Sequence, residues 1–331
     1  MSSFSNHILL SGIVISILFD QSLALPSGGK FTHGTSGSIS INDNHMNIHG
    51  NGQNSVIQWG GGFSIGKGES VNFNGNNKNY LNIAHGTSKS TIEGLLNASG
   101  NNVFLINPNG VIITKTGTIN ANRFVASTSS ISSDEIQKFA NGKTNTIQSP
   151  IIKLDKNNGN VVNMGNINAE EVVFIGNKIL LNSNIKNSND LLTKINSKNI
   201  KLIGNKIDID TSNINANSLS KLEVSAKERG SIYLNASGYY YDPNSFAVFD
   251  KLKQADFQNI KHNNSFNIYD FVGISSDVDW WHFAKGWNEN KKDFRNTATE
   301  YRLTNDIDFK GKNYANYCIE GYGCTNISYL Q

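Results

Sequence analysis

The chain contains little cysteine, proline, tryptophan or charge. Its 331 residues include 2 Cys, 4 Pro and 4 Trp, and Asp, Glu, Lys and Arg together make up 17% with a formal net charge of +3. Charges spread this thinly form no basic stripe, so we expect no nucleic acid among its partners. After residue 24 there is no uninterrupted run of about 18 apolar residues, so the sequence predicts no membrane-spanning helix there.

Asparagine and glycine are abundant instead, at 51 and 30 residues. Both are poor helix formers, which argues against a helix-rich protein. Ile, Val, Leu and Phe recur at short intervals, which argues against disorder. The apolar bursts are bounded by Asn, Gly, Ser or Lys, as in SISIND, NVFLI, VVFIG, KILLN, IKLIG, KIDID and SIYLN. Short strands joined by Asn and Gly turns predict an all-β chain.

Internal repeats narrow the fold class. Ile-Asn-Ala occurs in GTINANRFV (117–125), GNINAEEVV (165–173) and SNINANSLS (212–220), at intervals of 48 and 47 residues, and IGNKI recurs at an offset of 28. Periods in this range are typical of solenoids, and a coil of a parallel β-helix takes somewhat more than 20 residues. We therefore interpret the 48-residue interval as two coils. A β-sandwich is the alternative, but it does not predict such repeats.

The asparagines have a structural interpretation within a β-helix. Asn at matching turns of successive coils can stack into amide ladders, as in other stacked β structures. This explains the asparagine content without any catalytic chemistry.

The first 24 residues are predicted to be a signal peptide. Ile8 to Phe19 is an apolar block of 12 residues, too short to span a bilayer permanently. Ser22 and Ala24 are small residues at the positions that a signal peptidase reads, so cleavage is expected after Ala24. The segment before the block has no Lys or Arg, and a buried strand or helix at a mature N-terminus is the alternative.

Cys318 and Cys324 are separated by five residues, two of them glycine. Export permits a disulfide, which we favour over two free thiols. A metal site is less favoured, because no His or further Cys lies beside the pair.

Asn107, Pro108, Asn109 and Gly110 interrupt two apolar runs, VFLI and VIIT. Proline fixes φ near the value needed at the second turn position, and Asn and Gly tolerate the left-handed region that follows. The stretch predicts a strand, a tight turn and a strand, with both strands buried in the core.

Several stretches together resemble one family. They are ALPSGGKFTHGTSGSI (24–39), FSIGKGESVNF (63–73) and STIEGLLNASGNNVFLINPNGVIITKTGTINANRFVAST (90–128). In this order they resemble the two-partner secretion domain of filamentous-haemagglutinin-like exoproteins, whose most recognisable signature is Asn-Pro-Asn-Gly followed by an aliphatic residue. The resemblance runs from about residue 25 to about residue 240 and is densest between 56 and 130.

The resemblance implies a right-handed parallel β-helix with an N-terminal cap and extra-helical β-hairpins. It implies export from a Gram-negative bacterium through a partner outer-membrane β-barrel transporter, which recognises the turn at residues 107–110 through amides displayed at the surface. The expected protein is a monomer without catalysis or cofactor, secreted or retained at the outer-membrane surface. It adheres to glycans or proteins of host or other cells.

We expect three segments: a signal peptide (1–24), a two-partner secretion domain (25–240) and a distal segment (241–331). In the distal segment, EYRLTNDIDFKGKNYANYCIEGYGCT resembles the opening of an adhesin repeat, so a truncated or split exoprotein without adhesive activity is an alternative. A delivery rod for a C-terminal toxin is less favoured.

A polysaccharide-active enzyme is the main alternative of another class, because parallel β-helices also carry pectate-lyase-type activity. Candidate acids are Asp208 and Asp210, and Asp306 and Asp308, since a spacing of two places both carboxylates on one strand face. Alternation with Ile207 and Ile209 favours an outward polar face instead.

Other chemical signals are weak. GGFSIGKGE nearly spells a phosphate-binding loop but has glycine where Ser or Thr is needed. His45 and His49 share a strand face but are too far apart for one metal ion. Aromatic clusters at 239–241 and 280–281 are interpreted as capping the core, in preference to a sugar-binding platform.

Overall fold

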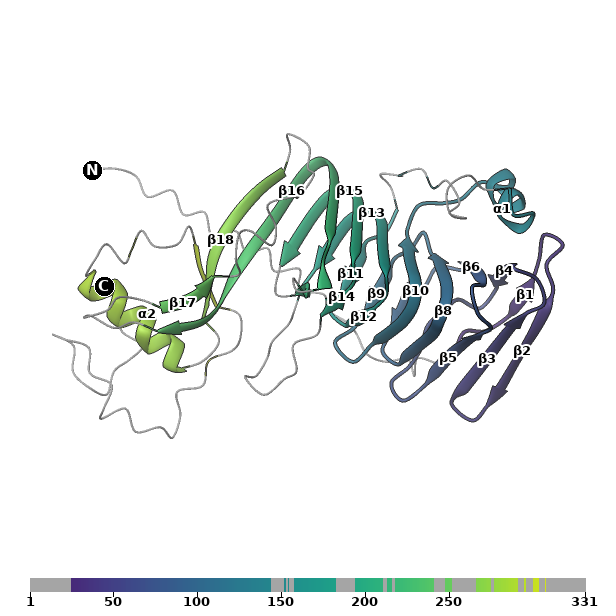
Figure 1. The fold of residues 1–331 in the computed structure, drawn as a ribbon, viewed down its shortest axis with the longest axis horizontal. Coiled ribbons are helices and arrows are strands. Elements are labelled where there is room, and N and C mark those ends of the chain that lie inside the picture. Colours follow the sequence, from purple (N-terminus) through teal and green to yellow (C-terminus); the bar gives the residue numbers. More distant parts are fainter. Residues whose placement is uncertain are drawn as a thin grey trace.

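The fold is known from a computed structural model. It describes residues 25–143, 152, 154, 158–182, 194–210, 213–215, 218–240, 248–251, 266–274, 277–290, 295, 300–303 and 307. The chain is an all-β parallel solenoid of about six turns with few helices (Figure 1). The predicted fold class, a parallel β-helix, is confirmed.

The N-terminal end is a cap with antiparallel pairing. Strand β1 (Gly29–Phe31) is antiparallel to β4 (Asn54–Trp59), and β2 (Gly37–Asn42) is antiparallel to β3 (His45–Gly50). From β3 and β4 onward, β5 and β6 begin a series of parallel pairings between successive coils. The coil strands are β5 (Ser70–Asn74), β6 (Asn79–Ala84), β7 (Ser90–Ile92), β8 (Leu95–Ile106), β9 (Val111–Ile113), β10 (Thr118–Ser127), β11 (Val161–Asn163), β12 (Asn166–Asn168), β13 (Glu171–Leu181), β14 (Ile195–Asn196), β15 (Asn199–Asp210) and β16 (Lys221–Tyr240).

Parallel stacking continues beyond β16. Strand β18 (Phe266–Ile274) pairs with β16 and β19 (Glu300–Leu303) with β18, both in parallel. Strand β17 (Val248–Lys251) forms an antiparallel pair with β16. The helices are α1 (Ser133–Ala140) and α2 (Asp277–Glu289).

The register corrects the interpretation of the repeats. Ile119 of β10 lies directly opposite Ile167 of β12, so that 48-residue interval is one coil, not two. The extra length includes α1, which lies between the two strands in the sequence. The second interval does span two coils, because Ile167 pairs with Ile195 and Ile195 bridges to Ile214. The repeat at an offset of 28 is one coil, with Ile175 opposite Ile203.

An inner core fills the solenoid. Alternate residues of each strand point inward, so one face of every coil contributes to a shared apolar interior. The interior includes Ile57, Val71, Leu105, Phe124 and Phe174, each 3% exposed or less.

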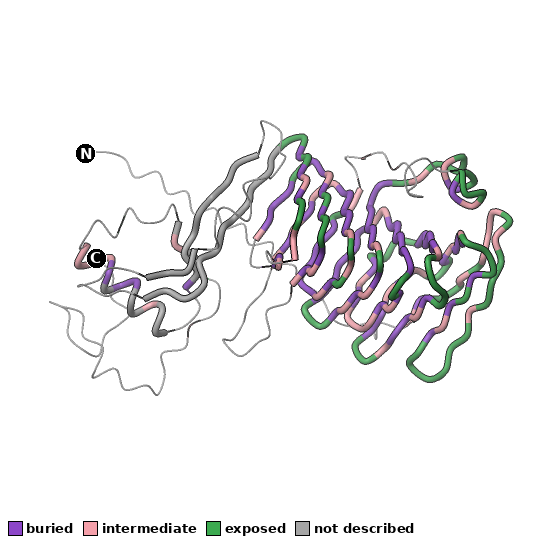
Figure 2. The backbone as a smooth tube through the Cα atoms, in the orientation of Figure 1, coloured by how far each residue is buried: buried purple, intermediate pink, exposed green. Residues whose placement is uncertain are grey.

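A second core lies outside the solenoid, under α1. Phe104, at 0% exposure, packs edge-to-face against Phe139 of α1 with ring centroids 5.5 Å apart. This outer core also contains Val56, Leu81, Ile83, Ile106, Val125, Ile136, Val173 and Ile175. The strands beneath α1 are therefore buried on both faces, and Figure 2 shows buried backbone along this part of the solenoid.

Helix α1 has a signal that could have been read in the sequence. Ser132 is its N-cap and accepts a hydrogen bond from the backbone N–H of Glu135 at 3.3 Å. Ser followed three residues later by Glu is the capping-box pattern. None of the helices that the structure describes is long and apolar enough to cross a membrane.

At the far end of the solenoid, α2 carries aromatic residues that pack on one another. The ring of Phe283 lies 5.8 Å from that of Trp280, 5.7 Å from that of Trp287 and 4.8 Å from that of Tyr301. Phe283 is 9% exposed. The rings meet at tilted angles of 59°, 47° and 41°, so they do not form one flat surface for a sugar. Capping of the core stays a prediction.

Candidate functional site: the Asn-Pro-Asn-Gly turn and the asparagine ladders

The Asn-Pro-Asn-Gly stretch joins β8 to β9 as a closed turn. The N–H of Gly110 donates to the carbonyl of Asn107 at 3.1 Å. Gly110 has a φ of 140°, and a Cβ there would lie 3.2 Å from Cγ of Lys89 and 3.3 Å from the carbonyl oxygen of Asn160. The positive φ therefore favours glycine, and a Cβ would also be tight against both neighbours. The predicted strand–turn–strand is confirmed, and all residues of VFLI and VII are at most 8% exposed.

The side chain of Asn107 is buried, at 1% exposure. Its Nδ2 donates to the carbonyl of Ser88 at 3.1 Å and to Oγ of Ser90 at 2.9 Å. Its Oδ1 accepts from the backbone N–H of Asn109 at 3.0 Å. The expectation that the turn displays both amides at the surface is thus wrong for Asn107, because this amide fastens the turn to the preceding coil.

Asn109 and Pro108 form the accessible part of the turn, since both are half-buried. Nδ2 of Asn109 donates to the carbonyl of Gly86 at 2.8 Å. On the other side, the carbonyl of Pro108 accepts from the N–H of Gly159 at 2.7 Å. The N–H of Asn107 donates to the carbonyl of Ser127 at 2.9 Å. The turn therefore binds to the coil before it and to the coil after it.

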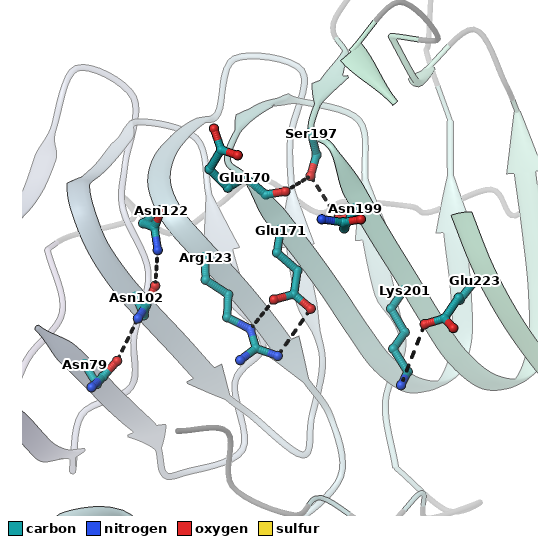
Figure 3. A network of polar contacts seen from close by, with 10 residues as sticks. All are labelled: Asn79, Asn102, Asn122, Arg123, Glu170, Glu171, Ser197, Asn199, Lys201 and Glu223. Atoms are coloured by element: carbon teal, nitrogen blue, oxygen red, sulfur yellow. Dashed lines mark hydrogen bonds and ion pairs between the residues drawn. The ribbon is translucent and has the colours of Figure 1, made fainter. Parts of the chain in front are cut away.

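One asparagine ladder, which we call the buried ladder, confirms the predicted stacking; its inner members Asn79 and Asn102 are buried. At its ends, Asn54 is half-buried and Asn122 is exposed. Nδ2 of Asn79 donates to Oδ1 of Asn54 at 2.7 Å, Asn102 to Asn79 at 2.7 Å and Asn122 to Asn102 at 2.8 Å. Figure 3 shows its last two rungs. Nδ2 of Asn54 donates to the carbonyl of Phe139 at 3.0 Å, which attaches α1 to the ladder. Asn79 and Asn102 thus bond to the amides before and after them, so these buried polar groups are paired.

A second ladder forms a column on the surface, which we call the asparagine column. The side chain of Asn168 donates to Asn120 at 2.9 Å, Asn196 to Asn168 at 2.8 Å and Asn215 to Asn196 at 2.8 Å. Register extends the column toward the cap. Its members are Asn47, Asn72, Asn97, Asn120, Asn168, Asn196 and Asn215, all half-buried except Asn168, which is exposed.

In the strand register, the position that follows Asn102 of the buried ladder is occupied by a charged pair. Arg123 lies opposite Asn102 on one side and Glu171 on the other. Nε of Arg123 is 3.0 Å from Oε2 of Glu171 (Figure 3). Burial lowers the pKa of Arg123, and the attraction of Glu171 opposes that shift.

The candidate catalytic acids do not form an open site in the part that is described. Asp208 alternates with Ile207 and Ile209 of the inner core and so faces out of the solenoid, as predicted, but it is only 7% exposed. Its Oδ2 is 3.3 Å from Nζ of Lys178. Asp210 is half-buried. Asp306 and Asp308 lie outside the described residues, as do Ala24, Cys318 and Cys324. His45 and His49 are exposed, as expected.

Taken together, these features define a capped parallel β-helix whose coils are joined by amide ladders. The model of the TPS (two-partner secretion) secretion domain matches residues 24–269. The chain therefore belongs to the family of two-partner secretion domains.

Two Haemophilus influenzae proteins are similar to it. The chain is 31% identical over 174 residues to the heme/hemopexin-binding protein, a match that covers 50% of this chain and 18% of that protein. The chain thus spans less than a fifth of the length of that relative. The crystal structure of the HMW1 secretion domain matches 87% of this chain and 85% of its own, at 20% identity and a TM-score of 0.35.

Proposed function

We propose that residues 25–240 direct the exported chain to a partner outer-membrane β-barrel transporter, which secretes it. The observation that carries this proposal is the match to the two-partner secretion domain across residues 24–269. The fold suits such export, because each coil of a solenoid gains its contacts by stacking on the preceding one. A chain whose N-terminal end leaves the transporter first can therefore fold coil by coil outside the cell.

The turn at Asn107–Gly110 is, in this proposal, part of what the transporter recognises. In the folded domain only Pro108 and Asn109 are accessible, because Asn107 is 1% exposed. A transporter that binds the chain before the turn closes would meet both amides. In this proposal the transporter recognises the amide of Asn107 only in the unfolded chain. It can recognise the amide of Asn109 in either the folded or the unfolded chain.

The direct experiment expresses the full chain with and without a candidate two-partner secretion transporter from the same bacterium. We expect the protein in the medium or on the cell surface only when the transporter is present, and in the periplasm otherwise. A matched control is a transporter variant that lacks its periplasmic domains. Equal secretion with and without the transporter would contradict the proposal.

Processing is part of the same proposal. Removal of residues 1–24 after Ala24 leaves Leu25 as the first residue, and Edman sequencing of the secreted protein tests this. Cys318 and Cys324 are proposed to form a disulfide, which non-reducing mass analysis of the secreted protein tests. A retained leader, or two free thiols, would contradict the respective part.

We also propose that the secreted chain adheres to glycans or proteins of other cells without catalysis. The asparagine column supports adhesion, because Asn168 and Asn196 each donate one amide hydrogen to the ladder, and a side-chain amide has a second hydrogen for a hydroxyl or carbonyl of a ligand. Substituting Asn168 and Asn196 with alanine should lower cell binding while secretion continues. A chain that is secreted but never adheres would be a secretion module only.

A further inference from the structure

Strand β2 is the outermost described strand at the N-terminal end of the solenoid and lies at an edge of the sheet (Figure 1). Within the described part of the chain, β2 pairs only with β3. Its sequence is GSISIN, with no charged residue and no proline, and its register with β3 is free of bulges. Proteins usually blunt a sheet edge with lysine, proline or a bulge. The strand has none of these devices, which indicates that the edge is used for pairing.

The backbone groups that β2 leaves unpaired can be identified by parity. The carbonyl of Ser36 accepts from the N–H of Asn51 at 2.9 Å, and Gly37 lies opposite Gly50. In an antiparallel pair, backbone groups alternate between facing the partner strand and facing away. Ser36 faces β3, so Gly37, Ile39 and Ile41 direct their N–H and C=O groups outward.

The same two isoleucines carry the apolar surface of the edge. Ile41 is 58% exposed and Ile39 is half-buried against the inner core. Both border a hollow of about 410 Å³ at the end of the solenoid, whose lining includes Leu25, Met46 and Trp59. Outward hydrogen-bonding groups and an exposed apolar face thus occur at the same residues.

We propose that this edge pairs with β2 of a second copy of the chain. Around a two-fold axis at Ser40, Ile39 of one copy lies opposite Ile41 of the other, and these residues exchange both backbone hydrogen bonds. Shifting the axis by one residue to Ile39 would keep the parity but place Ile41 opposite Gly37. Only the register at Ser40 pairs the two isoleucines with each other.

Charge also favours a second copy. Neither β2 nor β3 contains Asp, Glu, Lys or Arg, so two copies meet at this seam without like charges directly opposite. A two-fold interface must be complementary to itself, and the alternation Ser-Ile-Ser-Ile satisfies that requirement. The apolar ends of two solenoids then join into one core, and the protein is a dimer, which revises the expectation of a monomer.

Light scattering on the secreted full chain, across a concentration series, is the first test. We expect twice the monomer mass. In Ile41→Lys the dissociation constant should rise about tenfold or more, because each copy brings a charge to the seam. Leu303→Lys is the matched control, since Leu303 is also 58% exposed, and it should remain a dimer. At concentrations where the parent is a monomer, both variants should melt as the parent does, because each side chain is 58% exposed in the single chain.

Cross-linking tests the register. In a background with Cys318→Ser and Cys324→Ser, Ser40→Cys should form an intermolecular disulfide, because the two Cα atoms would be about 4.5 Å apart. Ser38→Cys should not, since its counterpart lies four residues away along the strand. Equal cross-linking at both positions would overturn the register.

Three results would overturn self-pairing itself. One is a monomer at every concentration, and another is a dimer that Ile41→Lys leaves intact. The third is a monomer whose β2 amides become protected from hydrogen exchange only when the transporter's periplasmic domains are added. That last result would assign the edge to a strand of the transporter.

Discussion

Residues that lie opposite one another on successive strands form a column along the solenoid. In one such column the side chains change from apolar to charged, and this change separates an early from a late region. The column runs outward-facing through Val56, Leu81, Phe104, Val125, Val173, Lys201 and Glu223. Its first five residues belong to the outer core, whereas Nζ of Lys201 and Oε2 of Glu223 are 4.0 Å apart on the surface. The strands are equivalent in backbone structure, so the difference lies in what covers them.

A second column changes in the same way. Asn54, Asn79 and Asn102 are followed by Arg123 and Glu171. In these two columns, early coils are joined by apolar packing and neutral amides, and later coils by ion pairs. Lys178–Asp208 and Lys198–Glu170 are further ion pairs of the late region, where the asparagine column also continues. The comparison indicates that packing and buried amides stabilise the early region, while electrostatics contributes mainly to the late one.

The largest effect is expected from emptying the outer core. Phe104→Ala should lower the free energy of unfolding by about 3–5 kcal/mol, because it leaves a cavity beside Phe139. Lys201→Ala is the control in the same column and should cost about 0.5 kcal/mol or less, as an exposed pair contributes little. Denaturant melts of the two variants check this. Equal losses would remove the distinction between the regions.

A smaller effect is expected from interrupting the buried ladder. Asn102→Ala leaves Asn79 and Asn122 each without one amide partner. The loss should be about 2 kcal/mol, since Asn102 is 9% exposed and unpaired buried polar groups are costly. Melts in low and high salt should give the same loss, because no charge is involved. A loss that disappears in salt would contradict the amide account.

The ion pair after the ladder should behave differently. Glu171→Gln keeps the shape but removes the charge that faces Arg123. The side chains are 13% and 34% exposed, so we expect a loss of about 1 kcal/mol that shrinks as salt rises. Melts over a salt series check this, with Asn102→Ala as the reference. A salt-independent loss would mean that the pair acts through its hydrogen bond and not through its charge.

The smallest expected effect comes from the ionisation of Tyr80. It is absent at neutral pH and appears only in alkaline solution. Burial raises its pKa above the ordinary 10.0, against a lowering effect from the N–H of Gly50. The unfolded chain therefore ionises first, and the free energy of unfolding should fall as pH rises above 10. One group contributes at most about 1.4 kcal/mol per pH unit. Subtracting the curve of Tyr80→Phe isolates this fall, and parallel curves would contradict it.

Much of the solenoid was predictable from the sequence, because its determinants are local and repeated. The repeats predicted a solenoid, and the asparagine content predicted the ladders. That the IGNKI offset of 28 is one coil followed only from the register. The 48-residue interval misled, because Ile119 and Ile167 are one coil apart with α1 inserted between them. An interval in sequence does not distinguish two short coils from one coil with an insertion.

The outer core and the burial of Asn107 were not predictable in the same way. Phe104 and Phe139 meet only because α1 folds back over β8, a contact between residues far apart in sequence. Turn chemistry predicted the backbone at Asn107–Gly110 but not the direction of its side chains. The direction depends on Ser88 and Ser90 of the preceding coil, which accept hydrogen bonds from Asn107.

The central proposal is that the turn both holds neighbouring coils together and is recognised by the transporter. The most direct test measures secretion and thermal unfolding of two variants, Asn107→Asp and Asn109→Asp. Asn107→Asp turns a carboxylate oxygen toward the carbonyl of Ser88 and should lower both secretion and stability, the latter by about 2 kcal/mol or more. Asn109→Asp, at a half-buried position, should lower secretion while the purified protein melts nearly as the parent does. Normal secretion of Asn109→Asp would contradict the recognition role. The turn would then serve only to hold neighbouring coils together.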